Sequence, residues 1–167
     1  MLQVSVAGIV TIGMTLMIIA GQIDLSVGFL VSLAACVMAT LLKMDMPLVV
    51  IITAGLGLCV TLQAFAGYVI SKLKLEPFIV TLGGLSLYRA LALIYTGGTP
   101  IFGLPPEFRA ISNGTILGLP GPVIAVAVLA LIAWIVLTKT PLGEYLMAVG
   151  GNPEAARVAG VPVTLTK

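Results

Sequence analysis

Long stretches without a charged side chain are the feature that most constrains how this chain can fold. Charge-free runs occupy residues 1–23, 25–42, 47–71 and 110–138. A fifth apolar stretch, 77–101, is interrupted only by Arg89. A helix needs about 20 mostly apolar residues to cross a bilayer, whereas the strands of a membrane barrel alternate over about ten residues, which these runs do not. The sequence therefore predicts an all-α, polytopic transmembrane helical bundle of about five spans.

The scarcity of charge argues against several other classes of protein. Only 8% of the 167 residues are charged, whereas soluble domains carry about a quarter. The net charge of +2 is too small to indicate nucleic-acid binding, and the chain has no histidine for imidazole-based metal or acid–base chemistry. It also has no Ser/His/Asp set, no carboxylate pair and no Gly-x-x-x-x-Gly-Lys-Ser/Thr phosphate loop. We therefore expect no enzyme, no catalytic residue, no metal site and no cofactor.

The breaks between the runs predict helix boundaries and an orientation in the membrane. Pro47 and Pro77 suit the first turn of a helix, where the missing N–H goes unused. The basic residues outside the spans divide into five on one side and two on the other: Lys72, Lys74, Lys139, Arg157 and Lys167 against Lys43 and Arg109. Cytoplasmic loops are enriched in Lys and Arg. We therefore expect the 72–76 loop and the C-terminal tail in the cytoplasm, and the 101–119 loop outside.

One carboxylate, Asp24, lies between the first two runs, in the stretch GQIDLSVG. An acid within a membrane span normally faces the bundle interior or an aqueous cavity. The favoured interpretation is that Asp24 accepts from the first N–H groups of the next helix, while Ser26, Gly21 and Gly28 permit a tight break and close helix approach. Two alternatives stay open, a place in the lining of a solute pathway and an ion pair. Arg89 is the other charge within a span, and the sequence does not show whether it meets Asp24.

The segment 139–167 contains two sets of helix start and stop signals. Thr140 fits the N-cap of a first short helix that stops at Gly150. Asn152 fits the N-cap of a second, which stops at Gly160. The sequence thus predicts two short helices after the last span.

The second short helix contains the candidate residues for contact with another subunit. Glu154 and Arg157 suit the helix dipole at its two ends, and their spacing lets them pair. Ala155 and Ala156 give little area to bury, Ala156 lies on a small-residue face that a partner could approach closely, and Gly160 ends the helix. A helix of about seven residues is not stable alone in water, so it must dock on the bundle or on a partner. Both an ordinary loop helix and a coupling element remain open on this reasoning.

Three stretches carry a family resemblance. They are GQIDLSVGFL, LEPFIVTLGGLSLYRALALIYTGGTPI and PLGEYLMAVGGNPEAARVAGVPV. In order and spacing they resemble the permease subunits of bacterial ABC importers for monosaccharides such as ribose, xylose and galactose. The related permeases for branched-chain amino acids usually have an Asn-(Leu/Phe)-(Ala/Ser)-His-Gly run where this chain has Asp24 and Ser26, which favours sugar.

The resemblance implies a mechanism and a set of partners. It implies a single transmembrane permease domain over 1–167, incomplete relative to the family, with 139–167 as a cytoplasmic coupling loop. The implied location is the bacterial inner membrane. The implied partners are a separate ABC ATPase subunit, an extracytoplasmic sugar-binding protein, and a second permease subunit in a homodimer. In this interpretation Glu154, Ala155, Ala156, Arg157 and Gly160 contact the ATPase. A permease for branched-chain amino acids or nucleosides, and a membrane scaffold that transports nothing, are the alternatives.

Overall fold

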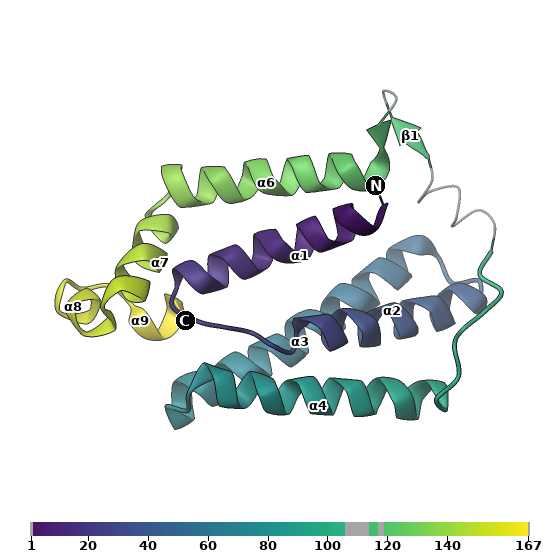
Figure 1. Ribbon diagram of the computed structural model, residues 1–167, viewed down its shortest axis with the longest axis horizontal. Coiled ribbons are helices and arrows are strands. Elements are labelled where there is room, and N and C mark those ends of the chain that lie inside the picture. The colour runs from purple at the N-terminus through teal and green to yellow at the C-terminus, as the bar shows by residue number, and fades with distance from the viewer. Residues whose placement is uncertain (1, 106–113, 117–118, 167) are drawn as a thin grey trace. The chain divides into compact units, whose positions relative to one another are not determined.

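The computed structural model describes residues 2–105, 114–116 and 119–166 (Figure 1). Each of the five predicted runs corresponds to one apolar helix. These are α1 Leu2–Ile19, α2 Val27–Lys43, α3 Leu48–Leu73, α4 Pro77–Thr96 and α6 Gly121–Lys139. In the described part of the chain they are followed by short helices α7 Pro141–Gly151, α8 Pro153–Val158 and α9 Val163–Thr166. Two-residue strands β1 Thr115–Ile116 and β2 Leu119–Pro120 pair antiparallel before α6. The predicted all-α class is confirmed.

The apolar helices differ in how far they can reach across a membrane. By length and composition, α3, α4 and α6 are each able to span one, while the stretch Val4–Ile19 of α1 and the helix α2 are shorter apolar stretches. α1 ends at Ile19 and α2 begins at Val27. The residues around Asp24 are therefore a helix break. Glu107 and Arg109, in the predicted outer loop, lie outside the described residues.

The chain divides into two compact units. Unit 1 comprises Met1–Ile23 and Ala110–Lys167. Within it, α1 and α6 lie side by side and run in the same direction, and α7 packs against both (Figure 1). The short helices α8 and α9 pack against α7 and each other. We call α7, α8 and α9 the α7–α9 module.

Unit 2 comprises Asp24–Arg109 and is built from three helices that pack on one another, α2, α3 and α4. Its buried core joins Leu30 and Leu33 of α2 to Tyr88 and Ala92 of α4. Leu62 of α3 is among the partly buried residues that pack against this core. The unit is thus a small three-helix bundle whose first helix begins directly after Asp24.

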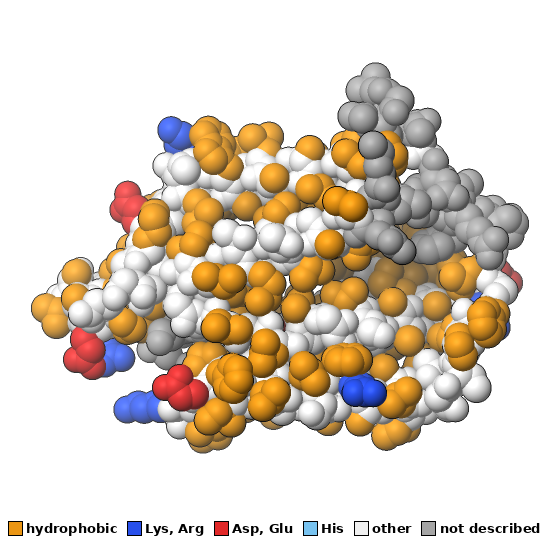
Figure 2. Space-filling model, viewed as in Figure 1, with side chains coloured by type: hydrophobic (Ala, Val, Ile, Leu, Met, Phe, Trp, Pro, Cys, Tyr) orange, Lys and Arg blue, Asp and Glu red, His pale blue; other side chains and the backbone are white. Residues whose placement is uncertain are grey.

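Hydrophobic side chains cover the outside of the helices in both units (Figure 2). In unit 2, for example, Val49 and Ile94 are 73% and 78% exposed. The threonine hydroxyls of the apolar helices donate to main-chain carbonyls four residues earlier, as at Thr11, Thr15, Thr53, Thr61 and Thr138. Such a surface matches lipid, because its polar atoms are satisfied within their own helix.

Glycines end three helices in the same way. The N–H of Gly21 donates to the carbonyl of Ile18 at 2.9 Å, and the next N–H donates five residues back at 2.9 Å. Gly97 and Gly160 repeat this pattern at the ends of α4 and α8. All three glycines have positive φ, between 61° and 86°, which a side chain would strain. The predicted stop at Gly160 is confirmed.

Candidate functional site

Asp24 is the centre of a buried hydrogen-bonded cluster, with only 4% of its surface exposed. Its Oδ1 accepts from the main-chain N–H of Ser26 at 2.7 Å and from the hydroxyl of Ser26 at 2.6 Å. Its Oδ2 accepts from the side-chain amide of Gln63, in α3. A buried carboxylate needs donors in place of water. These three bonds therefore explain how the chain accommodates an acid between two apolar runs.

The helix α4 approaches this cluster closely at a glycine. A Cβ placed on Gly84 would lie 3.2 Å from Cβ of Ser26, closer than side chains normally pack. One turn further along α4, the buried hydroxyl of Tyr88 donates to the carbonyl of Leu62 in α3 at 3.4 Å. Contacts from α2, α3 and α4 thus converge on one polar site. We call Asp24, Ser26, Gln63 and Gly84 the Asp24 node.

Three other residues that the sequence associated with Asp24 have different surroundings. Gly21 ends α1, in unit 1. Nothing lies within 4 Å of a Cβ placed on Gly28 among the described residues, so the expected close helix approach there is wrong. Arg89 is exposed, and its guanidinium carbon lies 5.6 Å from the centroid of the Phe29 ring. Over the described residues it forms no ion pair with Asp24, so that alternative is also wrong.

Gln63 is a partner of Asp24 that the local sequence does not identify. It is an amide in the long apolar run 47–71, and such residues more often join helix to helix than bind a solute. It does join two helices, but through a charged acceptor 39 positions earlier in the chain. The available signal was that one buried acid needs donors, and Gln63 is the sole amide side chain in that run.

A separate pocket of about 630 Å³ lies within unit 2, beside Arg89. Phe29 and Cys36 of α2 line one part of it, and Ala92 and Thr96 of α4 another. Most of its lining is apolar, and Asp24 is not part of it. The lining suits an apolar occupant better than a polyhydroxylated one.

The α7–α9 module has a small core of its own. Val149 of α7, Ala156 of α8 and Val163 of α9 are 1%, 4% and 7% exposed and form one cluster, against which Val161 packs. The expectation that Ala156 lies on an exposed face is therefore wrong. Its methyl group is what allows α8 to lie close to α7 and α9. Glu154, Ala155, Arg157 and Gly160 are exposed, as a contact surface requires.

The helix starts of the module are only partly as predicted. The Asn152 side chain accepts from the N–H groups of Glu154 and Ala155 at 3.0 and 3.1 Å, so the predicted N-cap of α8 is confirmed. Thr140 precedes α7 but does not cap it, because its hydroxyl donates back to the carbonyl of Val136 at 2.6 Å. Within the described part of the chain Glu154 and Arg157 form no ion pair, so their predicted pairing is wrong.

At two glycines of α7, the main chain of a neighbouring segment occupies the space that a side chain would fill. A Cβ on Gly143 would lie 2.6 Å from the Cα and carbonyl carbon of Leu137, at the end of α6. A Cβ on Gly150 would overlap the carbonyl of Ile19, at the end of α1, with the Ile19 carbonyl carbon at 2.9 Å. Residues seven apart share one face of a helix. One face of α7 therefore lies directly on the main chain of both long helices.

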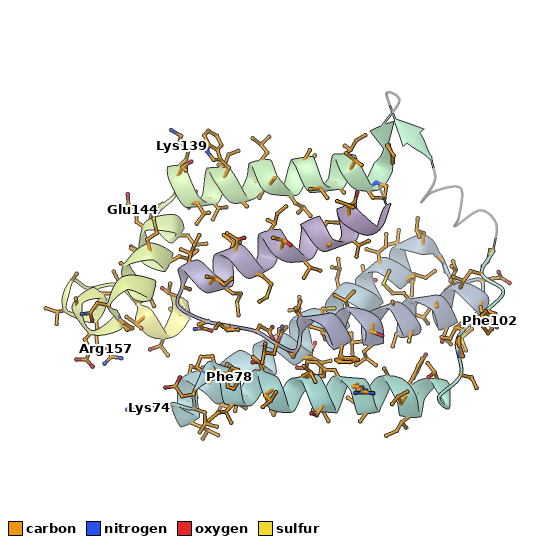
Figure 3. The ribbon with its side chains drawn as sticks, viewed as in Figure 1. Lys74, Phe78, Phe102, Lys139, Glu144 and Arg157 are labelled. Atoms are coloured by element: carbon orange, nitrogen blue, oxygen red, sulfur yellow. The ribbon has the colours of Figure 1, made fainter. Side chains whose placement is uncertain are left out.

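Charged side chains mark the outside of the module and the helix before it. Glu144 and Arg157 point away from the module, and Lys139 lies at the end of α6 (Figure 3). The ammonium group of Lys139 is 5.9 Å from the centroid of the Trp134 ring, and Trp134 is 54% exposed. Tryptophan and lysine near a helix end are typical of the membrane–water interface. This pair indicates where α6 leaves the lipid.

The whole chain, residues 1–167, matches the family described as branched-chain amino acid transport system / permease component. It is 38% identical over 167 residues to the ribose import permease protein RbsC of Bacillus subtilis, covering 99% of this chain and 52% of that protein. It is 36% identical over 166 residues to the L-arabinose transport system permease protein AraH of Escherichia coli K12, covering 99% and 51%. It is 34% identical over 162 residues to the autoinducer 2 import system permease protein LsrD of Enterobacter sp. strain 638, covering 93% and 50%.

Each match covers nearly all of this chain but only part of the relative. The chain spans about half the length of the relatives it matches. No solved structure matches it. The similarity therefore includes both the Asp24 node and the α7–α9 module, within the part of the relatives that this chain covers.

Proposed function

Because the chain belongs to the permease-component family of branched-chain amino acid transport systems and is a multi-pass protein of the bacterial inner membrane, we propose that it forms part of the pathway of an ATP-driven ABC importer for a monosaccharide. It corresponds to the N-terminal half of a membrane-spanning permease subunit. The observation that carries this proposal is the similarity over 99% of the chain to ribose and arabinose permeases. The family is one of transport components and not of enzymes.

The division of labour in such an importer agrees with the residues of this chain. Without a phosphate-binding loop in the sequence, ATP binding through that motif falls to a separate ATPase subunit. An extracytoplasmic binding protein delivers the sugar, and a second permease subunit completes the pathway. The exposed surface of α8, with Glu154, Ala155, Arg157 and the following Gly160, is where the ATPase docks.

The proposed orientation places the α7–α9 module in the cytoplasm. The basic residues of the 72–76 loop and of the segment after α6 favour this side. The Trp134–Lys139 pair at the end of α6 is compatible with it, because such a pair marks a membrane–water interface and α7 begins directly after it. In the same orientation the turn between α2 and α3 faces the outside.

The Asp24 node is proposed to hold the helix break between α1 and α2 in a fixed geometry. Its carboxylate holds the start of α2 to α3, and no described residue offers it a positive partner. Its two oxygens already accept three hydrogen bonds, so a sugar would have to compete with Ser26 and Gln63 for them. These existing hydrogen bonds favour a role of Asp24 in helix geometry over direct sugar binding.

An uptake assay tests the proposed function. The completed permease, defined as residues 1–167 followed by the part of the Bacillus subtilis ribose permease that they do not cover, is reconstituted in vesicles with the ATPase and binding protein of that ribose system. We expect ATP-dependent uptake of labelled ribose, and none with a non-hydrolysable ATP analogue. The chain alone is measured in parallel.

The same assay separates the alternatives. The same vesicles are tested with leucine, a nucleoside and autoinducer 2, each together with its own binding protein. Uptake of one of these in place of ribose would show that the transported solute is not a monosaccharide. The similarity to LsrD makes autoinducer 2 the most informative of these probes. ATPase association without uptake of any probe would favour a scaffold that transports nothing.

A further inference from the structure

The glycine face of α7 joins two parts of the molecule that the proposed function leaves unconnected. On one side, α7 contributes Val149 to the core that holds α8 and α9. On the other, its next residue, Gly150, meets the main chain of Ile19 and Ala20 at the end of α1. Consecutive residues therefore contact the candidate ATPase-docking helix and the last turn of a long apolar helix.

We propose that the contact between Gly150 and the last turn of α1 is the joint through which a displacement of α8 reaches the Asp24 node. This inference rests on the proposed function, in which α8 docks the ATPase. Gly150 and Gly21 are positioning residues in this scheme. Neither touches the solute or the nucleotide.

The module side of the joint is stiff. Val149, Ala156 and Val163 come from three different helices, and each is at least nine-tenths buried in their shared cluster. Close-packed side chains resist compression and transmit strain. A push on α8 therefore moves α7 with it, and Gly150 moves with α7.

The α1 side of the joint is also tightly constrained. The turn that ends α1 is closed by hydrogen bonds from Ala20, Gly21 and Gln22 to carbonyls of the last helical turn. A Cβ on Gly21 would lie 3.4 Å from the Cα of Gly150, so the two glycines face one another. The contact is between main chains, with no flexible side chain that could absorb a movement.

The connection from this turn to the Asp24 node is short. Only Gln22 and Ile23 separate Gly21 from Asp24. Extended chain spans at most about 3.6 Å per residue, so this connection limits how far its two ends can separate. At the far end, Asp24 is bound to the start of α2 through Ser26 and to α3 through Gln63. In this proposal a shift of the α1 end is passed along this connection to the hydrogen bonds that hold the start of α2 and α3.

The experiment exploits two neighbouring glycines of α7. Gly150→Ala places a methyl group onto the Ile19 carbonyl, whereas Gly151→Ala places one where nothing lies within 4 Å. Both variants are made in the completed permease. ATPase co-purification, binding-protein-stimulated ATP hydrolysis and sugar uptake are measured for each. We expect Gly150→Ala to keep the ATPase and its hydrolysis but to lose about tenfold or more in uptake per ATP. Gly151→Ala should match the parent protein.

A second pair of variants covers the case in which Gly150→Ala does not accumulate. Gly21→Ala strains the same joint from the α1 side, because Gly21 has φ of 73°, and Gly28→Ala is its matched control with open space around it. We expect Gly21→Ala to lower uptake per ATP and Gly28→Ala to leave it unchanged. The double variant Gly21→Ala/Gly150→Ala should lose less than the product of the single losses, since both changes act on one contact.

The outcomes also separate this joint from the proposed function. If the parent protein transports, and both Gly150→Ala and Gly21→Ala stay within about twofold of their controls in uptake per ATP, the joint is refuted while the importer stands. If a variant loses ATPase association together with uptake, its glycine serves docking, and the joint is refuted for it. A parent protein that neither retains the ATPase nor transports would overturn both.

Discussion

The Asp24 node and the α7–α9 module each follow the end of a long apolar helix, and they are held together by opposite means. The node uses a buried charge whose oxygens accept from Ser26 and Gln63. The module uses small side chains and glycines that allow close contact, with Ala156 at its centre and Gly150 at its edge. The node should therefore be sensitive to the loss of an acceptor and the module to added volume.

The largest effect is expected from Asp24→Leu. This change removes the acceptor for three donors, and each buried donor left without a partner costs about 1–3 kcal/mol. Asp24→Asn keeps one oxygen acceptor and should cost clearly less. Membrane protein level and the unfolding temperature in detergent, measured for both variants, check this order. Normal levels of Asp24→Asn with abolished uptake would instead make the charge itself functional.

A smaller effect, confined to the module, is expected from Ala156→Trp. The side chain would be forced into the cluster with Val149 and Val163, and overpacking a core typically costs about 1–3 kcal/mol. Limited proteolysis of the segment 141–166 should become faster, with the apolar helices unaffected. The control is Ala155→Trp, because Ala155 is exposed on the same helix. It should leave proteolysis unchanged and weaken ATPase co-purification, and equal proteolysis of the two variants would contradict the observed core.

The smallest effect is expected from substitution of the residues that directly precede α7 and α8, which are Thr140 and Asn152. Asn152→Ala removes two hydrogen bonds to the start of α8 and should cost about 1 kcal/mol. Thr140→Ala removes no cap, since its hydroxyl faces back into α6, and should cost less. Hydrogen exchange of the amides of Glu154 and Ala155 measures the first change. The amides at the start of α7 measure the second, and equally faster exchange at both sites would mean that Thr140 does cap α7.

The sequence was informative wherever a structure depends on residues close together in the chain. Four charge-free runs and one interrupted only by Arg89 located the five apolar helices, and the motif around Asn152 located the start of α8. Gly160 ended that helix as expected. These features follow from helical periodicity and from hydrogen bonds over a few residues, both of which can be evaluated without knowing the fold.

Contacts between distant segments were beyond such reasoning. Nothing near Asp24 identifies Gln63 as its partner, because that contact depends on how α2 and α3 pack. Ala156 was placed on the wrong side of its helix because a helix of six residues has too few positions to define a buried face. From the sequence, Gly150 was predicted only to end a helix. In the structure it contacts the end of α1, about 130 residues earlier in the chain.

The glycine motifs that end α1 and α4 bear on how the chain is made. Each is closed by hydrogen bonds that reach back at most five residues, to Met17 from Gln22 and to Leu93 from Gly98. Ribosomes add about 5–20 residues per second, while a helix forms in about a microsecond or less. These ends can therefore form as soon as Gln22 and Gly98 have been synthesised, before any later helix exists to pack against them. The C-terminal limits of these two helices are then set by hydrogen bonds that the nascent chain can form by itself.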